Sequence, residues 1–94
     1  MPLFSPDETV VRLGRLPGWK LVDASIQKQF VFDGFLDGIR FVDRVATIAE
    51  ASDHHPDIDI RYKRVTMTLS THSAGGITEK DFALAEQIDK MVRR

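Results

Sequence analysis

The chain has no cysteine, which excludes disulfides, thiolate nucleophiles and cysteine-ligated zinc sites. It also has no surplus of one charge, because 13 lysines and arginines stand against 14 acidic residues. The net charge of −1 gives no electrostatic reason to expect nucleic acid or an anionic membrane as the main ligand. The cluster Arg61, Lys63 and Arg64 is read as solvated charge at a strand end.

Long apolar runs are missing too. The longest, Phe82–Ala85, has four residues, far fewer than a membrane-spanning helix needs. The first five residues, Met1 to Ser5, have no basic start and no apolar core, so we expect no signal peptide and a cytoplasmic location. The 94 residues are 43% apolar and 29% charged, which predicts a single soluble domain over 1–94. At that size, partner subunits can supplement a modest core.

The first half of the chain predicts a short helix and a hairpin. Ser5 is placed to cap a helix that starts at Pro6, with Glu8 reaching back to the cap, and the helix should run to about residue 13. After a turn at 16–18, the segments 19–22 and 26–32 are separated by three residues. They therefore predict two antiparallel strands.

A long amphipathic helix is predicted from Gly34 to about Ser52. Its apolar stripe is expected to point to the core and leaves other apolar positions, including Phe41, for a subunit contact. The stripe consists of Phe35, Ile39, Val42, Ala46 and Ala49, widened by Leu36, Val45 and Ile48.

Pro56 cannot continue that helix, and alternating residues then predict one or two strands. The inward parity changes around Lys63 and Arg64, which requires a bulge, a bend or a break into two strands. The later piece, up to about Thr71, should be central. A glycine turn and a last helix capped by Thr78 follow. The sequence therefore predicts an α+β fold, with an antiparallel sheet of three to four strands and three helices packed on one face.

All three histidines lie at ends of predicted elements. His54 and His55 follow the long helix, His72 follows the central strand, and Asp81 lies in the first turn of the last helix. If these ends converge, imidazoles that titrate near neutrality suit general acid and base catalysis. Each residue also has a structural interpretation: His54 can suit the dipole at a helix end, His72 can close a strand, and Asp81 can serve the Thr78 cap.

A metal site is the competing interpretation, because three histidines can bind zinc and leave a position open. Adjacent residues of an extended segment point in opposite directions, so His54 and His55 would not readily share one ion. No HxH or HxxxH pair occurs. We therefore expect no metal and no cofactor.

Taken together, these residues resemble the signature of the pterin-4a-carbinolamine dehydratase family, also known as the dimerisation cofactor of a homeodomain transcription factor. The matching positions are Glu50, His54-His55-Pro56, Tyr62, His72 and Asp81, at the family's spacings. Segments 16–19 and 71–81 also resemble the family, so the likeness covers roughly residues 13 to 92. One departure is Ile58, where animal members often have tryptophan, which favours a bacterial-type member.

The resemblance implies loss of water from 4a-hydroxytetrahydropterin to give quinonoid dihydropterin. It implies that His54, His55 and His72 line the pterin site, with His54 and His72 exchanging protons and His55 positioning the pterin. Pro56 would aim the two histidines, and Asp81 would orient a histidine or hold the loop. Glu50 and Tyr62 complete the signature as supporting residues. Family members associate as homodimers or tetramers, and a homodimer is expected here.

Two other functions fit the same resemblance. One is a non-catalytic interaction module that stabilises a partner's dimer through an exposed apolar helix face. The other is an accessory protein linked to pterins, for example in molybdopterin metabolism. The sequence does not separate these from the enzyme.

Overall fold

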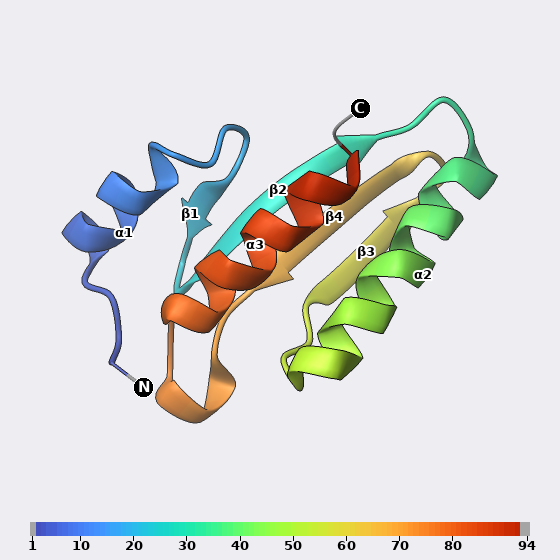
Figure 1. Cartoon of the computed structure of the whole chain (residues 1–94). Helices are drawn as coiled ribbons and strands as arrows, with labels where there is room; N and C mark the ends of the chain where they lie inside the picture. Colours follow the sequence, from blue (N-terminus) through green and yellow to red (C-terminus); the bar gives the residue numbers. More distant parts are fainter. Residues whose placement is uncertain (1, 93–94) are drawn as a thin grey trace.

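The computed structural model describes residues 2–92 and contains one four-stranded antiparallel sheet with helices on one face (Figure 1). The strands lie in the order β1-β2-β4-β3. This confirms the predicted fold class. The elements along the chain are α1 (Pro6–Leu13), β1 (Lys20–Val22), β2 (Ser25–Val31), α2 (Phe35–Ser52), β3 (Asp57–Arg61), β4 (Arg64–Leu69), the short 3₁₀ helix η1 (His72–Ala74) and α3 (Glu79–Val92).

The two faces of the sheet differ in polarity, and this difference places the core. Residues that pair across antiparallel strands share a face. Ile26 pairs with Leu69 and Phe30 with Val65, and all four side chains are buried under α2 and α3. The opposite face carries polar residues such as Gln27, paired with Thr68. The sheet is therefore covered on one side only.

The N-terminal signals act as the sequence predicts. The Ser5 side chain accepts the Glu8 amide N–H at 3.1 Å, and the Glu8 carboxylate accepts the Ser5 N–H at 2.8 Å. This reciprocal capping box starts α1 at Pro6. The Ser5 amide and hydroxyl hold the pKa of Glu8 below its ordinary value.

The core-facing side of α2 agrees with the predicted stripe at Val45 and Ala49 and differs from it elsewhere. Gly38, Phe41, Val45 and Ala49 are the buried residues, and Phe41 is fully enclosed between the Phe30 and Phe32 rings. Phe41 is therefore not available for a subunit contact, and the prediction that it contributes to one is wrong.

The reason for the shifted stripe lies at Gly38, where a Cβ would come within 3.3 Å of the Val65 side chain. This close approach turns the Gly38 side of α2 toward β4. Phe35, Leu36 and Ala46, predicted to lie in the stripe, are exposed instead.

The change of parity near residue 63 marks a break into two strands. β3 and β4 form a hairpin through the turn at Tyr62 and Lys63, with Tyr62 in the left-handed region at φ 53°. β4 lies between β2 and β3, so its predicted central position is confirmed, although it ends at Leu69 rather than at Thr71. β3 is an edge strand, and all five of its residues are exposed.

Among residues 2–92, no helix is both long enough and apolar enough to cross a bilayer.

Candidate active site

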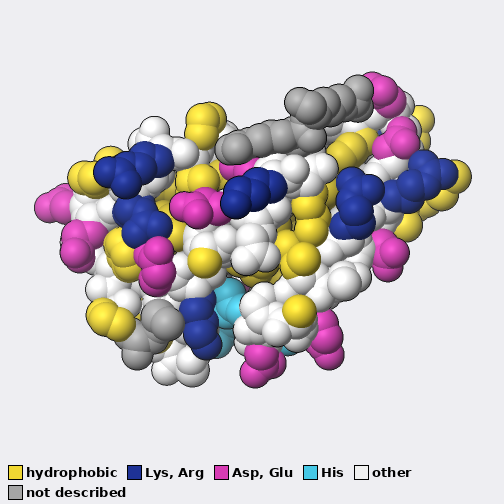
Figure 2. Space-filling view, in the orientation of Figure 1, with side chains coloured by type: hydrophobic (Ala, Val, Ile, Leu, Met, Phe, Trp, Pro, Cys, Tyr) yellow, Lys and Arg dark blue, Asp and Glu magenta, His cyan; other side chains and the backbone are white. Residues whose placement is uncertain are grey.

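Three chain segments meet at one end of the sheet. Asp57 pairs with Thr68, so the start of β3 lies beside the end of β4. His54 and His55, which precede β3, therefore come to the same end as His72, which follows β4. A cavity of about 320 Å³ opens there, within the size range of small-molecule sites. It is lined by Asp53, His54, His55, Ser70, Thr71, His72, Ser73 and Lys80. In Figure 2 histidine atoms are set back between other side chains at this end of the molecule.

His54 is held by the way α2 ends. Asp53 takes the left-handed conformation at φ 51°, which aspartate tolerates better than most residues. The His54 amide N–H then donates to the Ala49 carbonyl at 3.1 Å, closing the helix end. The ring turns inward, with its side chain 10% exposed, and His54 Nε2 lies 2.6 Å from Asp81 Oδ1.

Asp81 is completely buried and holds two elements together. Its Oδ2 accepts the Thr78 amide N–H and the Thr71 hydroxyl, each at 2.9 Å, while Oδ1 faces His54. These contacts are compatible with both interpretations of Asp81 from the sequence, because the same carboxylate accepts the Thr78 amide N–H at the start of α3 and contacts His54. A buried carboxylate with this many partners is well suited to hold an imidazole in one orientation.

His55 points away from His54. Its Nε2 lies 2.7 Å from Glu50 Oε1, and both side chains are largely exposed. Pro56, which follows, keeps His55 out of the helical conformation. The two adjacent histidines thus pair with different carboxylates, one buried and one at the surface.

His72 begins η1 and is exposed at the rim of the cavity. Its backbone position is fixed by its neighbour. The Thr71 amide donates to the Gly76 carbonyl at 2.7 Å, and the Thr71 carbonyl accepts from Ala74 and Gly75 at 3.0 Å. Gly75 has φ 79°, which closes this turn at a position where a side chain would be strained.

Tyr62 is a signature residue that lies away from this site. It lies in the β3–β4 turn, at the other end of a five-residue strand that spans about 17 Å at the usual rise per residue. It is 69% exposed and lines a different cavity on the open face of the sheet.

Sequence reasoning missed several residues of the site, of which Lys80, Thr71 and Thr78 matter most for its hydrogen bonds. Lys80 lines the cavity, and the Thr71 and Thr78 hydroxyls lie 2.7 Å apart behind it. Thr78 was interpreted only as a helix cap and Thr71 only as the end of a strand. A threonine directly before His72 and another three residues before Asp81 were the available signals.

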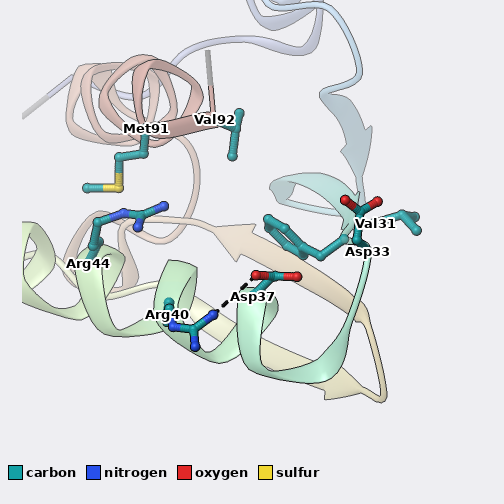
Figure 3. Close-up of a pocket in the computed structure, with 8 residues that line it drawn as sticks. Val31, Asp33, Asp37, Arg40, Arg44, Met91 and Val92 are labelled. Carbon is teal, nitrogen blue, oxygen red and sulfur yellow. Dashed lines mark hydrogen bonds and ion pairs between the residues drawn. The ribbon is translucent and has the colours of Figure 1, made fainter. Parts of the chain in front are cut away.

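Among residues 2–92, no group of three or more histidine, aspartate or glutamate side chains is arranged to hold a metal ion. A further cavity, of about 290 Å³, lies at the opposite end of the sheet between α2 and α3 (Figure 3). It contains an exposed ion pair, Arg40 with Asp37 at 3.2 Å, and no histidine lines it. Of these two cavities, only the one at His54 combines histidine side chains with a buried carboxylate behind its wall.

The arrangement at His54 can move protons without a redox group. One imidazole is backed by a buried carboxylate, and a second, at the rim, is open to solvent. Such a pair can donate a proton to one atom of a bound molecule and remove a proton from another.

Comparison with known proteins supports a family assignment. The family model for pterin 4 alpha carbinolamine dehydratase matches residues 2–91. A protein of Mycobacteroides abscessus named "Putative pterin-4-alpha-carbinolamine dehydratase" is 53% identical over 94 residues, the whole of both chains. A Chloroflexus aurantiacus protein with the same name is 50% identical over 98% of this chain and 99% of its own.

Two solved structures resemble the chain. One, a transcriptional coactivator/pterin dehydratase from Brucella melitensis, matches with a TM-score of 0.93 and 34% identity, covering 98% of this chain and all of the other. The second is a pterin dehydratase-like protein described as a RuBisCO assembly factor. It matches with a TM-score of 0.64 and 24% identity over 78% of this chain, a likeness of fold alone.

Proposed function

The chain belongs to the pterin-4-alpha-carbinolamine dehydratase family, and on that premise we propose that it removes water from 4a-hydroxytetrahydropterin to give quinonoid dihydropterin. In this reaction the C4a hydroxyl leaves as water after gaining a proton, and ring N5 loses a proton. The loss of water does not change the oxidation state of the pterin. The step therefore needs two proton transfers and no redox partner.

The single observation that carries the proposal is the 2.6 Å contact between His54 and the buried Asp81 at the wall of a cavity that His55 and His72 also line. A histidine held in this way is already oriented before the substrate arrives. The cavity, at about 320 Å³, lies at the lower end of the range found for small-molecule sites, as suits a compact bicyclic ring.

We assign His54 and His72 to the two proton transfers, because they approach the cavity from different elements. His55, anchored by Glu50, positions the pterin, and Pro56 fixes the chain direction that separates the two adjacent rings. Asp81 acts through His54 and not on the pterin. Tyr62 lies outside this cavity, so a direct role for it requires a second subunit.

The test is the rate of dehydration of chemically generated carbinolamine, measured above the uncatalysed rate, with purified full-length protein. We expect His54→Ala and His72→Ala each to lower kcat by about 100-fold or more, the usual range for loss of a general acid or base. His55→Ala should mainly raise KM, which makes it the matched control. Near wild-type turnover in both of the first two variants would exclude the assignment, and no acceleration by the wild-type protein would favour the non-catalytic alternatives.

We also propose that the chain forms a homodimer through the edge of β3. Within residues 2–92 this strand pairs on one side only, and Ile58 and Ile60 are exposed on its helix-side face. Unprotected edge strands with apolar residues tend to pair with another chain. Light scattering should give twice the chain mass for the wild type, and Ile60→Glu should shift the mass toward the monomer. A wild-type monomer at micromolar concentration would contradict this interface.

A further inference from the structure

A chain of hydrogen bonds connects the start of α3 to the ring of His54. The Lys80 amide donates to Thr78 Oγ1 at 3.3 Å, and Thr78 Oγ1 lies 2.7 Å from Thr71 Oγ1. Thr71 Oγ1 donates to Asp81 Oδ2 at 2.9 Å, and Asp81 Oδ1 lies 2.6 Å from His54 Nε2. Both threonines are buried, so water does not compete for these bonds.

The direction of the protons follows from counting donors. A hydroxyl has one proton and two lone pairs. Thr71 commits its proton to Asp81, so the proton between the two hydroxyls belongs to Thr78. The Thr78 oxygen in turn accepts the Lys80 amide N–H. The Thr71 and Thr78 hydroxyls then each donate one hydrogen bond and accept one.

The opposite direction does not satisfy these contacts. It would place a proton on Asp81 Oδ2, which already accepts the Thr78 amide N–H. It would also leave the Thr78 hydroxyl proton without an acceptor among the side chains that the structure describes. Asp81 Oδ2 therefore only accepts. At Oδ1 we assign the proton of the His54 contact to the imidazole, because an imidazole is a stronger base than a carboxylate, so that Asp81 accepts from three donors.

Because Asp81 only accepts, His54 must donate to it from Nε2. This holds for the charged ring and for the neutral ring, so neutral His54 has its proton on Nε2 and a free lone pair on Nδ1. Which nitrogen of a histidine carries the proton is set by the hydrogen bond that the ring makes. Only Nδ1 is then left to exchange a proton with a bound molecule.

We propose that Thr71 is a positioning residue whose hydroxyl keeps Asp81 oriented toward His54, which fixes the Nε2–H tautomer and makes Nδ1 the atom that exchanges protons. The last part rests on the proposed dehydratase function, whereas the tautomer itself does not. Thr71 is well placed for this role because its own backbone is fixed by the bonds to Gly76, Ala74 and Gly75, next to His72.

The first test measures the His54 tautomer in the wild-type sequence and needs no substrate. Histidine rings labelled with ¹⁵N give separate NMR signals for protonated and bare nitrogens, and the His55→Gln and His72→Gln variants identify the signals of His54. We expect neutral His54 to show a protonated Nε2 and a bare Nδ1. A neutral ring protonated mainly at Nδ1 would overturn the proposal.

The second test changes the hydroxyl alone. Thr71→Val keeps the shape of threonine, and we expect a mixture of His54 tautomers and a kcat lower by about 10- to 100-fold, with KM within about twofold. Thr71→Ser keeps the hydroxyl and should retain the wild-type tautomer and most of the activity. Unchanged tautomer and kcat in folded Thr71→Val would refute the role of Thr71.

Thr9→Val is the matched control for loss of a buried threonine hydroxyl. Thr9 is buried in α1 and donates to the Ser5 carbonyl at 2.9 Å, away from the His54 cavity. The Thr9→Val variant should be less stable than the wild type, with the same His54 tautomer and the same kcat. If the wild-type protein shows no dehydratase activity but His54 has the expected tautomer, the proposed function fails while the hydrogen-bond assignment stands.

Discussion

Two buried aspartates on α3, Asp81 and Asp89, differ in what surrounds them. They lie eight residues apart, about 12 Å along the helix axis, and both are almost fully enclosed. Asp89 accepts from the Trp19 indole N–H at 3.1 Å and from the Lys28 ammonium at 3.0 Å. Asp81 accepts from an amide, a hydroxyl and His54.

The partners decide what each carboxylate can do. The Trp19 indole offers a fixed N–H donor, and the Lys28 ammonium forms an ion pair with Asp89. Asp89 therefore acts as a fixed clamp between β2, α3 and the segment before β1. The imidazole beside Asp81 can gain and lose a proton and faces a cavity. Burial of an acid is thus a sign of function only where one of its partners is itself titratable and open to a ligand.

The largest effect that we expect separates the two aspartates by activity. An amide offers one acceptor oxygen where Asp81 uses two, so Asp81→Asn must present its NH₂ group either to His54 or to the Thr71 and Thr78 donors. The first arrangement reverses the tautomer and the second loses the cap bonds. We expect kcat to fall by about 1,000-fold, within the range for a disabled general acid or base.

Asp89→Asn is the matched substitution on the same helix. It should leave kcat within about threefold of wild type and lower the free energy of unfolding by about 2 kcal/mol, the value of a hydrogen bond to a charged group. Parallel dehydration assays and urea unfolding curves measure both quantities. Equal losses of activity in the two variants would show that Asp81 and Asp89 do not differ in their contribution to catalysis.

The next effect concerns stability at the clamp. Lys28 Nζ bonds to Asp89 and to the Pro17 carbonyl, each at 3.0 Å, and lies over the Phe30 ring. Lys28→Met would leave a buried carboxylate without its cation, and we expect a loss of about 3 kcal/mol, at the lower end for a broken buried pair. Catalytic constants should be unchanged. If kcat falls under conditions where the Lys28→Met variant is fully folded, the contacts of Asp89 and the site at His54 are coupled.

The smallest effect comes from an exposed acid in the same first turn as Asp81. Glu79 forms two hydrogen bonds with Arg12, at 2.7 and 3.1 Å, and the Arg12 guanidinium holds the pKa of Glu79 below its ordinary value of 4.5. A lowered pKa means that the fold favours the ionised form. The stabilisation is therefore complete above the ordinary pKa and is lost as the pH falls through the lowered one.

Comparison of Glu79→Gln with the wild type by urea unfolding checks this sign. We expect a difference of about 0.5 kcal/mol near pH 7, small because the pair is solvated, and none near pH 2. High salt should also reduce it. A difference that persists in acid would assign the effect to packing rather than to charge.

The fold was largely predictable because its signals are local. The capping box at Ser5, the stop at Pro56 and the parity change near Lys63 each act within a few residues, and the structure confirms all three. The phase of α2 was not predictable in the same way. Both of its sides carry large apolar residues, and the choice of Phe41 over Phe35 depends on how closely Gly38 approaches a strand 27 residues later.

The candidate site could be predicted in part of its residues and not in how they contact one another. Fixed spacings identified His54, His72 and Asp81, because each lies at the end of an element. Which histidine meets Asp81 depends on the end geometry of α2, set by the left-handed Asp53. The spacing of Tyr62 fits the family signature equally well, yet the β3–β4 hairpin carries that residue to the opposite end of the sheet. Spacing along the chain does not reveal such a reversal.

The clamp at Asp89 also provides a spectroscopic reporter. Trp19 is the sole tryptophan, and its indole touches a residue 70 positions away in the sequence. Its fluorescence therefore reports the packing of the segment before β1 against α3 and the core, while the His54 ring signals report the assembly of the pocket. Coincident unfolding curves from the two probes would establish that the pocket forms and melts together with the whole domain. If the two curves separate, a state exists in which Trp19 is still packed against α3 while the pocket at His54 has already unfolded.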